Sequence, residues 1–211
     1  MTFTKSLVAI AIASVGGAAF AAPTTYTGYD NSVSAIGANA AAAAASFNSA
    51  APGTSVIDFE SAVPAGVSIS GGSITNNSGC GALCGFNTTS GGQNFLLLFG
   101  GSATFTFATP VNAFGFYVSG LQTDLVPTET LTFSDGSSQT INIGPSTGGG
   151  DGFVGFTDLS GVSSVTYNAT NDIVAIDDVR YGALSAVPEP ASFALFGAGL
   201  LGLGLARRRR G

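Results

Sequence analysis

Apolar and polar residues alternate in short segments from Ser55 to Gly182. The segments are rich in β-branched and aromatic residues and end at Gly, Pro, Asn, Asp or Ser; clear examples are residues 104–107, 114–118, 130–133, 140–143 and 164–167. A period of two is typical of half-buried strands. Asp135-Gly136 between two such segments indicates a tight hairpin. The pattern predicts about ten strands joined by short turns.

These strands predict an all-β domain over residues 55–183. Regular turn signals between short strands favour an antiparallel β-sandwich of the jelly-roll type, and an up-and-down barrel is the alternative. The continuous apolar segment at residues 95–99 predicts a strand buried on both faces. The chain shows no strict repeat, which disfavours a solenoid.

An Ala-rich helical segment, residues 22–54, precedes this domain. Alanine has the highest helix propensity, so residues 32–50 are predicted to form a helix. Asp30, Asn31 or Ser32 is the expected N-cap, because their side chains can accept the free N–H groups of the first turn. Pro52-Gly53 is expected to end the helix.

The first residues predict a secretory signal peptide over residues 1–21. Lys5 precedes an apolar stretch from Leu7 to Val15, and the small residues Ala19 and Ala21 provide an A-x-A cleavage site. The expected partners of this segment are the secretion machinery and signal peptidase.

The last segment, residues 184–211, has three parts in order. Val187-Pro188-Glu189-Pro190 comes first, apolar residues 191–206 follow, and Arg207, Arg208, Arg209 and Arg210 come last. The prolines keep the backbone extended and accessible. Residues 191–206 give roughly 24 Å of helix, and bilayer thinning or snorkelling arginines can close the gap to a hydrocarbon core of about 30 Å. The arginines are expected to stay in the cytoplasm, which makes the segment a stop-transfer anchor in the inner membrane.

This three-part segment resembles the PEP-CTERM sorting signal of Gram-negative, exopolysaccharide-producing bacteria. The motif of that family corresponds here to Pro188, Glu189 and Pro190. The resemblance implies export by the general secretory (Sec) route and transient anchoring in the inner membrane through residues 191–206. It also implies processing by an exosortase near the motif and final placement at the cell surface or outside the cell.

Charge and cysteine usage agree with an exported protein. Lys5 and the four terminal arginines lie in the two signals, so Arg180 is the one basic residue of the remaining chain. Binding to nucleic acid relies on Lys and Arg contacts to phosphate and is therefore not expected. Cys80 and Cys84 are an even pair in a Gly-rich loop, and in an oxidising compartment they are predicted to form a disulfide.

Four acidic residues form a candidate calcium site. Asp58 and Glu60 share one face of the first strand, and Asp177 and Asp178 lie in the last strand. If these two strands pair, the carboxylates approach one another, and hard oxygen ligands suit Ca²⁺. The alternative is that the four acids are solvated strand-end residues. No other cofactor is expected.

Composition does not favour an enzyme. The chain has no histidine, which excludes Ser-His-Asp and Cys-His catalytic sites and histidine metal sites.

The sequence therefore predicts a structural or adhesive surface protein associated with exopolysaccharide or biofilm. A carbohydrate-binding module on the same export route is the main alternative, although Trp, the best stacking platform, is absent. A secreted hydrolase with paired carboxylates is the third.

Overall fold

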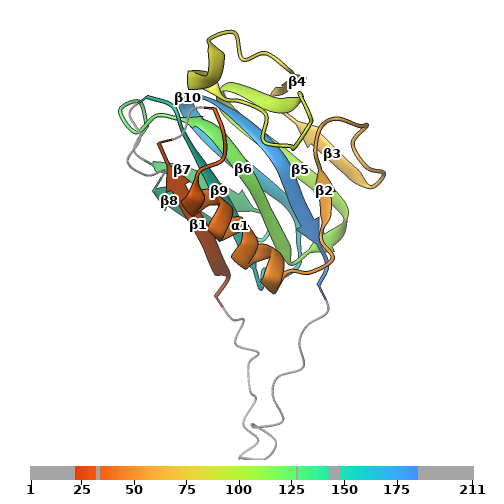
Figure 1. The fold of residues 1–211 in the computed structure, drawn as a ribbon. Coiled ribbons are helices and arrows are strands. Elements are labelled where there is room, and N and C mark those ends of the chain that lie inside the picture. The colour runs from red at the N-terminus through yellow and green to blue at the C-terminus, as the bar shows by residue number, and fades with distance from the viewer. Residues whose placement is uncertain (1–21, 32–33, 127, 143–147, 185–211) are drawn as a thin grey trace, which may run out of the picture.

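A computed structural model describes residues 22–31, 34–126, 128–142 and 148–184 of this protein (Figure 1). The predicted signal peptide, the Pro-Glu-Pro motif, the apolar segment 191–206 and the four terminal arginines lie outside these residues. Within the described ranges, no helix is both long and apolar enough to cross a membrane.

The described residues form mainly antiparallel β-structure with a single α-helix and one short 3₁₀ helix. The ten strands belong to a 10-stranded sheet whose main order is β1-β9-β6-β10-β5-β3. Their bounds are β1 Thr24–Asp30, β2 Ser55–Ile57, β3 Val67–Ser70, β4 Ser73–Thr75, β5 Phe95–Val111, β6 Ala113–Leu121, β7 Thr128–Phe133, β8 Ser138–Asn142, β9 Gly150–Thr157 and β10 Val162–Gly182. The expectation of an all-β, antiparallel fold is confirmed, and the jelly-roll assignment stays a prediction.

The two longest strands bend and take part in two halves of the sheet. The second part of β10 pairs with β6, beside β9 and β1, and we call this the β6 half. The first part of β10 pairs with β7, beside β8, and we call this the β7 half. The bend in β5 falls at Gly100 and Gly101, both with φ of 69°. Opposite them, β10 has register shifts on both sides of Thr170. Such irregularities let one strand pass from one layer into another.

The main core lies between the two halves. Its buried residues come from both, with Phe114, Phe116 and Phe156 on one side and Phe133 and Tyr167 on the other. Rings meet across the core in the pairs Phe116–Tyr167 and Phe133–Phe156, with centroids 5.2 and 5.5 Å apart. Each such ring pair stabilises the fold by about 0.5–1.5 kcal/mol, in addition to the stabilisation from the apolar area that it buries. The layered arrangement is therefore sandwich-like, although the strands are continuous.

Helix α1, Ala38–Ala50, covers the outer face of the β6 half (Figure 1). Phe47 is its largest buried side chain and packs on Phe153 of β9 at a centroid distance of 5.5 Å. The approach is close because β1 has Gly28 at the contact, where a Cβ atom would lie 2.1 Å from the carbonyl oxygen of Asn39. The helix is thus part of the folded domain.

Two expectations for the N-terminal segment are wrong. Residues 24–30 form β1, which pairs with β9 from Thr24↔Thr157 to Asp30↔Asp151, so the sheet begins well before residue 55. The helix begins at Ala38 and not at residue 32, with Gly37 as its N-cap. Asp30, at the end of β1, still caps the helix, because its carboxylate accepts the N–H of Ala40 at 2.9 Å. The predicted helix end at residue 50 is confirmed.

Candidate functional site at the disulfide loop

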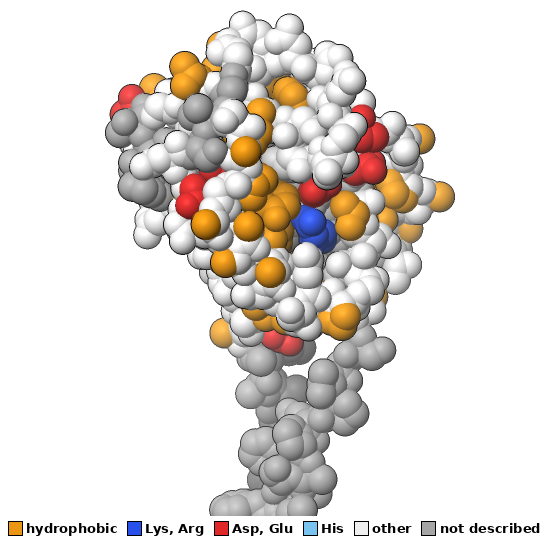
Figure 2. Space-filling model, in the orientation of Figure 1, with side chains coloured by type: hydrophobic (Ala, Val, Ile, Leu, Met, Phe, Trp, Pro, Cys, Tyr) orange, Lys and Arg blue, Asp and Glu red, His pale blue; other side chains and the backbone are white. Residues whose placement is uncertain are grey.

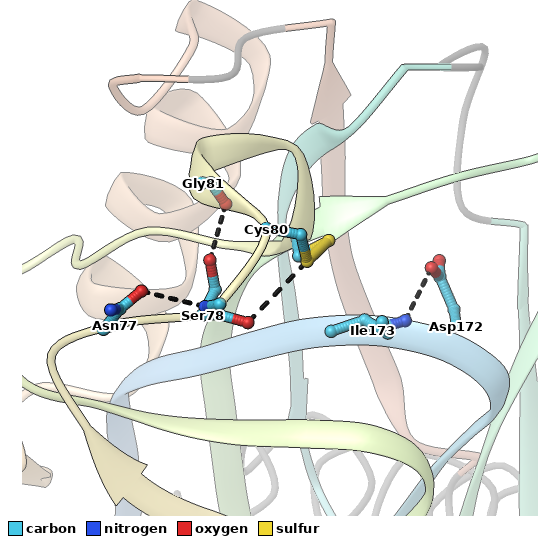
Figure 3. The surroundings of a disulfide bond; sticks show 8 residues. Asn77, Ser78, Cys80, Gly81, Asp172 and Ile173 are labelled. Atoms are coloured by element: carbon cyan, nitrogen blue, oxygen red, sulfur yellow. Dashed lines mark hydrogen bonds between the residues drawn. A yellow bond between two sulfur atoms is a disulfide. The ribbon is translucent and has the colours of Figure 1, made fainter.

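A short disulfide loop, residues 76–85, lies against the β6 half near Ser119 of β6 (Figure 1, Figure 3). Cys80 and Cys84 form the predicted disulfide, with their Cα atoms 5.7 Å apart across the 3₁₀ helix η1, Gly81–Cys84. The hydroxyl of Ser78 donates to the carbonyl of Gly81 at 2.6 Å. The disulfide and this hydrogen bond fix a Gly-rich segment that has little propensity for regular structure.

The end of the disulfide loop is pressed directly onto the sheet. The N–H of Phe86 donates to the Ser119 hydroxyl at 2.9 Å, and that hydroxyl donates back to the Phe86 carbonyl at 2.9 Å. Gly85 has a φ of 113°, and a Cβ atom there would lie 2.4 Å from the Cβ of Ala175. Glycine is therefore required for this approach.

The next segment, residues 86–94, is held by a buried carboxylate. Asp177 of β10 is fully buried and accepts the backbone N–H groups of Thr88 and Thr89 at 2.7 and 3.2 Å. The Thr88 hydroxyl also donates to it, at 3.1 Å. Burial raises the pKa of Asp177 to about 6, although these hydrogen bonds act in the opposite direction. The hydrogen bonds to Asp177 therefore hold residues 86–94 against β10.

Two more predicted acids bind the same segment. Glu60 accepts the backbone N–H groups of Gln93 and Asn94 at 2.7 and 2.6 Å. Asp178 accepts the hydroxyl of Thr89 at 2.8 Å and forms an ion pair with Arg180 at 3.8 Å.

Arg180 itself is seated on aromatic rings. Its guanidinium lies 5.2 Å from the ring centroid of Tyr117 and 5.8 Å from that of Phe153. It is the one Lys or Arg among the described residues, and the blue atoms in Figure 2 adjoin acidic and apolar side chains. A cation on aromatic faces is favourable, and its charge also offsets that of Asp178.

The strand pairing on which the calcium hypothesis depends is present, but Asp58 and Glu60 lie beyond the end of β2 at Ile57 and not within the strand. β2 pairs with β10 through Ile57↔Val179, which brings Asp58 to the level of Asp178. The carboxylates nevertheless face protein donors, and Asp58 accepts the N–H of Glu60 at 3.1 Å. Within the described residues, no group of three or more acidic, cysteine or histidine side chains could hold a metal ion. Calcium binding at Asp58, Glu60, Asp177 and Asp178 stays a prediction that this hydrogen bonding does not support.

Residues 76–95 line a pocket of about 370 Å³. We call it the amide pocket, because amide side chains dominate its lining: Asn76, Asn77, Asn87 and Gln93, with the rings of Phe86 and Phe95. Each amide both donates and accepts hydrogen bonds. The pocket lining carries no charged side chain, so its chemistry suits a neutral, hydroxyl-bearing ligand.

Neither this pocket nor Glu129 was predicted from the sequence. Residues 76–95 lack a periodic pattern, and their contacts reach residues far along the chain. Glu129 did leave a signal, because it is in phase with Leu131 and Phe133 on β7 and must therefore face the core. It is 1% exposed.

Comparison with known proteins concerns the C-terminal segment. The family model of the PEP-CTERM protein-sorting motif matches residues 186–210, a range that includes Pro188, Glu189, Pro190 and the arginines at 207–210. No curated protein and no solved structure gives a significant match to the chain. The chain carries the PEP-CTERM protein-sorting motif, which marks it as an exported protein that an exosortase processes and sorts to the cell surface.

Proposed function

We propose that this protein is a structural or adhesive component of the extracellular matrix, associated with exopolysaccharide and without catalytic activity. The observation that carries the proposal is the sorting motif at residues 186–210. Export by the Sec route, with transient anchoring through residues 191–206, is part of the same proposal.

The geometry of the domain supports presentation at a surface. Register places Thr24, Thr157, Ala113 and Gly182 at one end of the β6 half, so the described chain enters and leaves the sheet at the same end (Figure 1). The disulfide loop docks near Ser119, toward the other end of β6. A domain held through its C-terminal side would direct the disulfide loop and the amide pocket away from the point of attachment.

Replacing Pro188, Glu189 and Pro190 with alanine is expected to block sorting. Wild-type protein should appear at the cell surface with a shortened C-terminus, whereas the variant should keep its full C-terminal segment and stay in the membrane fraction. Intact-mass spectrometry after cell fractionation measures both properties.

The matched control is Pro52→Ala in an exposed turn, which should be sorted like wild type. An exosortase-deficient strain should reproduce the motif variant, and both strains should form less biofilm. Identical masses and locations for wild type and motif variant would contradict the sorting mechanism. Unchanged biofilm in both strains would contradict the matrix role alone.

A carbohydrate-binding module is the second candidate function. The amide pocket favours it, because neutral amides beside the partly exposed ring of Phe86 match the hydroxyls and apolar face of a sugar. On a glycan array, the exported protein is then expected to bind selectively. Gln93→Ala should weaken that binding about five- to tenfold, since one ligand hydrogen bond is lost. Asn171→Ala, an exposed amide elsewhere, should leave it unchanged.

A further inference from the structure

A second cleft lies between two strands that each pair on one side only among the described strands. β1 pairs with β9, β8 pairs with β7, and a cleft of about 340 Å³ separates β1 from β8. Its lining includes Thr25, Thr27 and Tyr29 of β1, Gln139 and Asn142 of β8, and Phe156 of β9. This β1–β8 cleft opens on the side where the two halves of the sheet are not joined.

Buried polar atoms lie next to residues that line this cleft. Glu129 sits directly opposite Ile141 in the pairing of β7 with β8, and Ile141 also lines the cleft. One carboxylate oxygen of Glu129 accepts the hydroxyl of Tyr167. The other oxygen, Oε1, and the hydroxyl of Tyr29 are buried and have no hydrogen-bond partner among the described residues.

Tyr29 connects the open cleft to Glu129. Its ring lines the cleft, and burial together with the nearby Glu129 carboxyl raises the pKa of the Tyr29 phenol. Nearly all buried polar groups in folded proteins have hydrogen-bond partners, because an unmade bond in a dry interior is costly. Two unpartnered atoms beside a cleft therefore point to a partner that enters from outside.

The lining restricts the chemistry of that partner. The lining offers hydroxyls and amides without a charged side chain, together with the partly exposed Tyr29. We propose that the β1–β8 cleft binds a neutral sugar unit, with its apolar face on Tyr29 and one hydroxyl directed at Glu129 Oε1 and the Tyr29 hydroxyl. The choice of a sugar rests on the proposed association with exopolysaccharide; the presence of the site rests on the cleft alone.

The test titrates the labelled, exported protein with D-glucose, D-galactose or N-acetyl-D-glucosamine and follows backbone amide signals by NMR. At least one sugar should shift the signals of Thr27, Tyr29 and Gln139. Tyr29→Phe and Glu129→Gln should each weaken that binding about five- to tenfold, because each alters one ligand hydrogen bond. Tyr29→Phe removes a hydroxyl that has no described partner, so it should fold normally. Tyr117→Phe, at the Arg180 contact, is the control and should bind like wild type.

Three outcomes would overturn the proposal. One is that no sugar shifts any signal, which leaves an ordered water as the occupant of the cleft. Another is that shifts occur only in residues 76–95, which would support the amide pocket and the carbohydrate-binding function while removing this site. The third is that the Tyr29→Phe and Glu129→Gln variants bind as tightly as wild type. None of these three outcomes bears on the proposed sorting through residues 186–210.

Discussion

Glu129→Gln is expected to make the protein more stable than wild type above about pH 8 and to flatten the dependence of its stability on pH. Glu129 lies in the core with 1% of its surface exposed. Burial raises its pKa from 4.5 to about 8; the Tyr167 hydrogen bond lowers that pKa and the charge of Asp172 raises it further. Glutamine keeps an oxygen for Tyr167 and carries no ionisable proton.

The sign follows from comparing the folded and unfolded states. Below pH 4.5 the carboxyl is neutral in both states, and its titration does not affect stability. As the pH rises toward 8, the unfolded chain loses the proton while the folded protein keeps it. The free energy of unfolding then falls by about 1.4 kcal/mol per pH unit, on the order of 5 kcal/mol in total, and levels off above the folded pKa. Glutamine does not titrate, so the Glu129→Gln protein does not lose this free energy of unfolding as the pH rises.

Urea unfolding of both proteins at a series of pH values measures the effect. Asp124→Asn, which changes an exposed acid, should follow the wild-type curve. Asp177 also has a raised pKa, about 6, and contributes a smaller decline that remains in the Glu129→Gln protein. Parallel curves for wild type and Glu129→Gln over the whole range would show that Glu129 is not the titrating group.

Asp177→Ala is expected to release residues 86–94 from the sheet and to destabilise the protein by about 3 kcal/mol. The substitution leaves the N–H groups of Thr88 and Thr89 without their buried acceptor, and unmade buried hydrogen bonds cost about 1–3 kcal/mol each. Hydrogen exchange should show faster exchange at these two amides than in wild type. Any glycan binding at the amide pocket should weaken too, because Asn87 and Gln93 lose their fixed positions.

Asp58→Ala is the matched control, since Asp58 accepts one local hydrogen bond, from the N–H of Glu60. It should change stability by less than about 1 kcal/mol and leave exchange at Thr88 and Thr89 as in wild type. If both variants behave alike, residues 86–94 are held by their remaining contacts and not by Asp177.

Part of the sheet could be predicted because strands such as β7 have one face toward the core and one toward solvent. Segments such as Thr130 to Phe133 carry that difference in their own residues. β1 was missed because it is an edge strand of threonines and tyrosines with Gly28 inside, and a pairing partner more than a hundred residues away decides its conformation. The late helix start has a similar cause, since Asp30 caps α1 from the preceding strand.

The candidate sites were harder to predict, because they depend on long-range contacts. The disulfide between Cys80 and Cys84 follows from spacing and compartment alone. The role of Asp177 does not, since its partners Thr88 and Thr89 meet it only in the folded sheet. Acidic residues at strand ends suggested a cation, whereas backbone N–H groups fill the same electrostatic role. The alternation of residues along β7 indicates that Glu129 faces the core. Acidic residues usually lie at the surface, however, so composition alone indicates the opposite.

The continuity of β10 through both halves has a mechanical consequence. If the protein is held beyond Gly182 and pulled at its disulfide loop, the load runs lengthwise along β10. Antiparallel hydrogen bonds lie perpendicular to the strand, so such a load shears many of them at once and does not open them one by one. β10 is paired with β5 and then β2 on one side and with β7 and then β6 on the other, so neighbouring strands share the force. A domain attached in this way resists unfolding best when flow pulls it along the direction of β10.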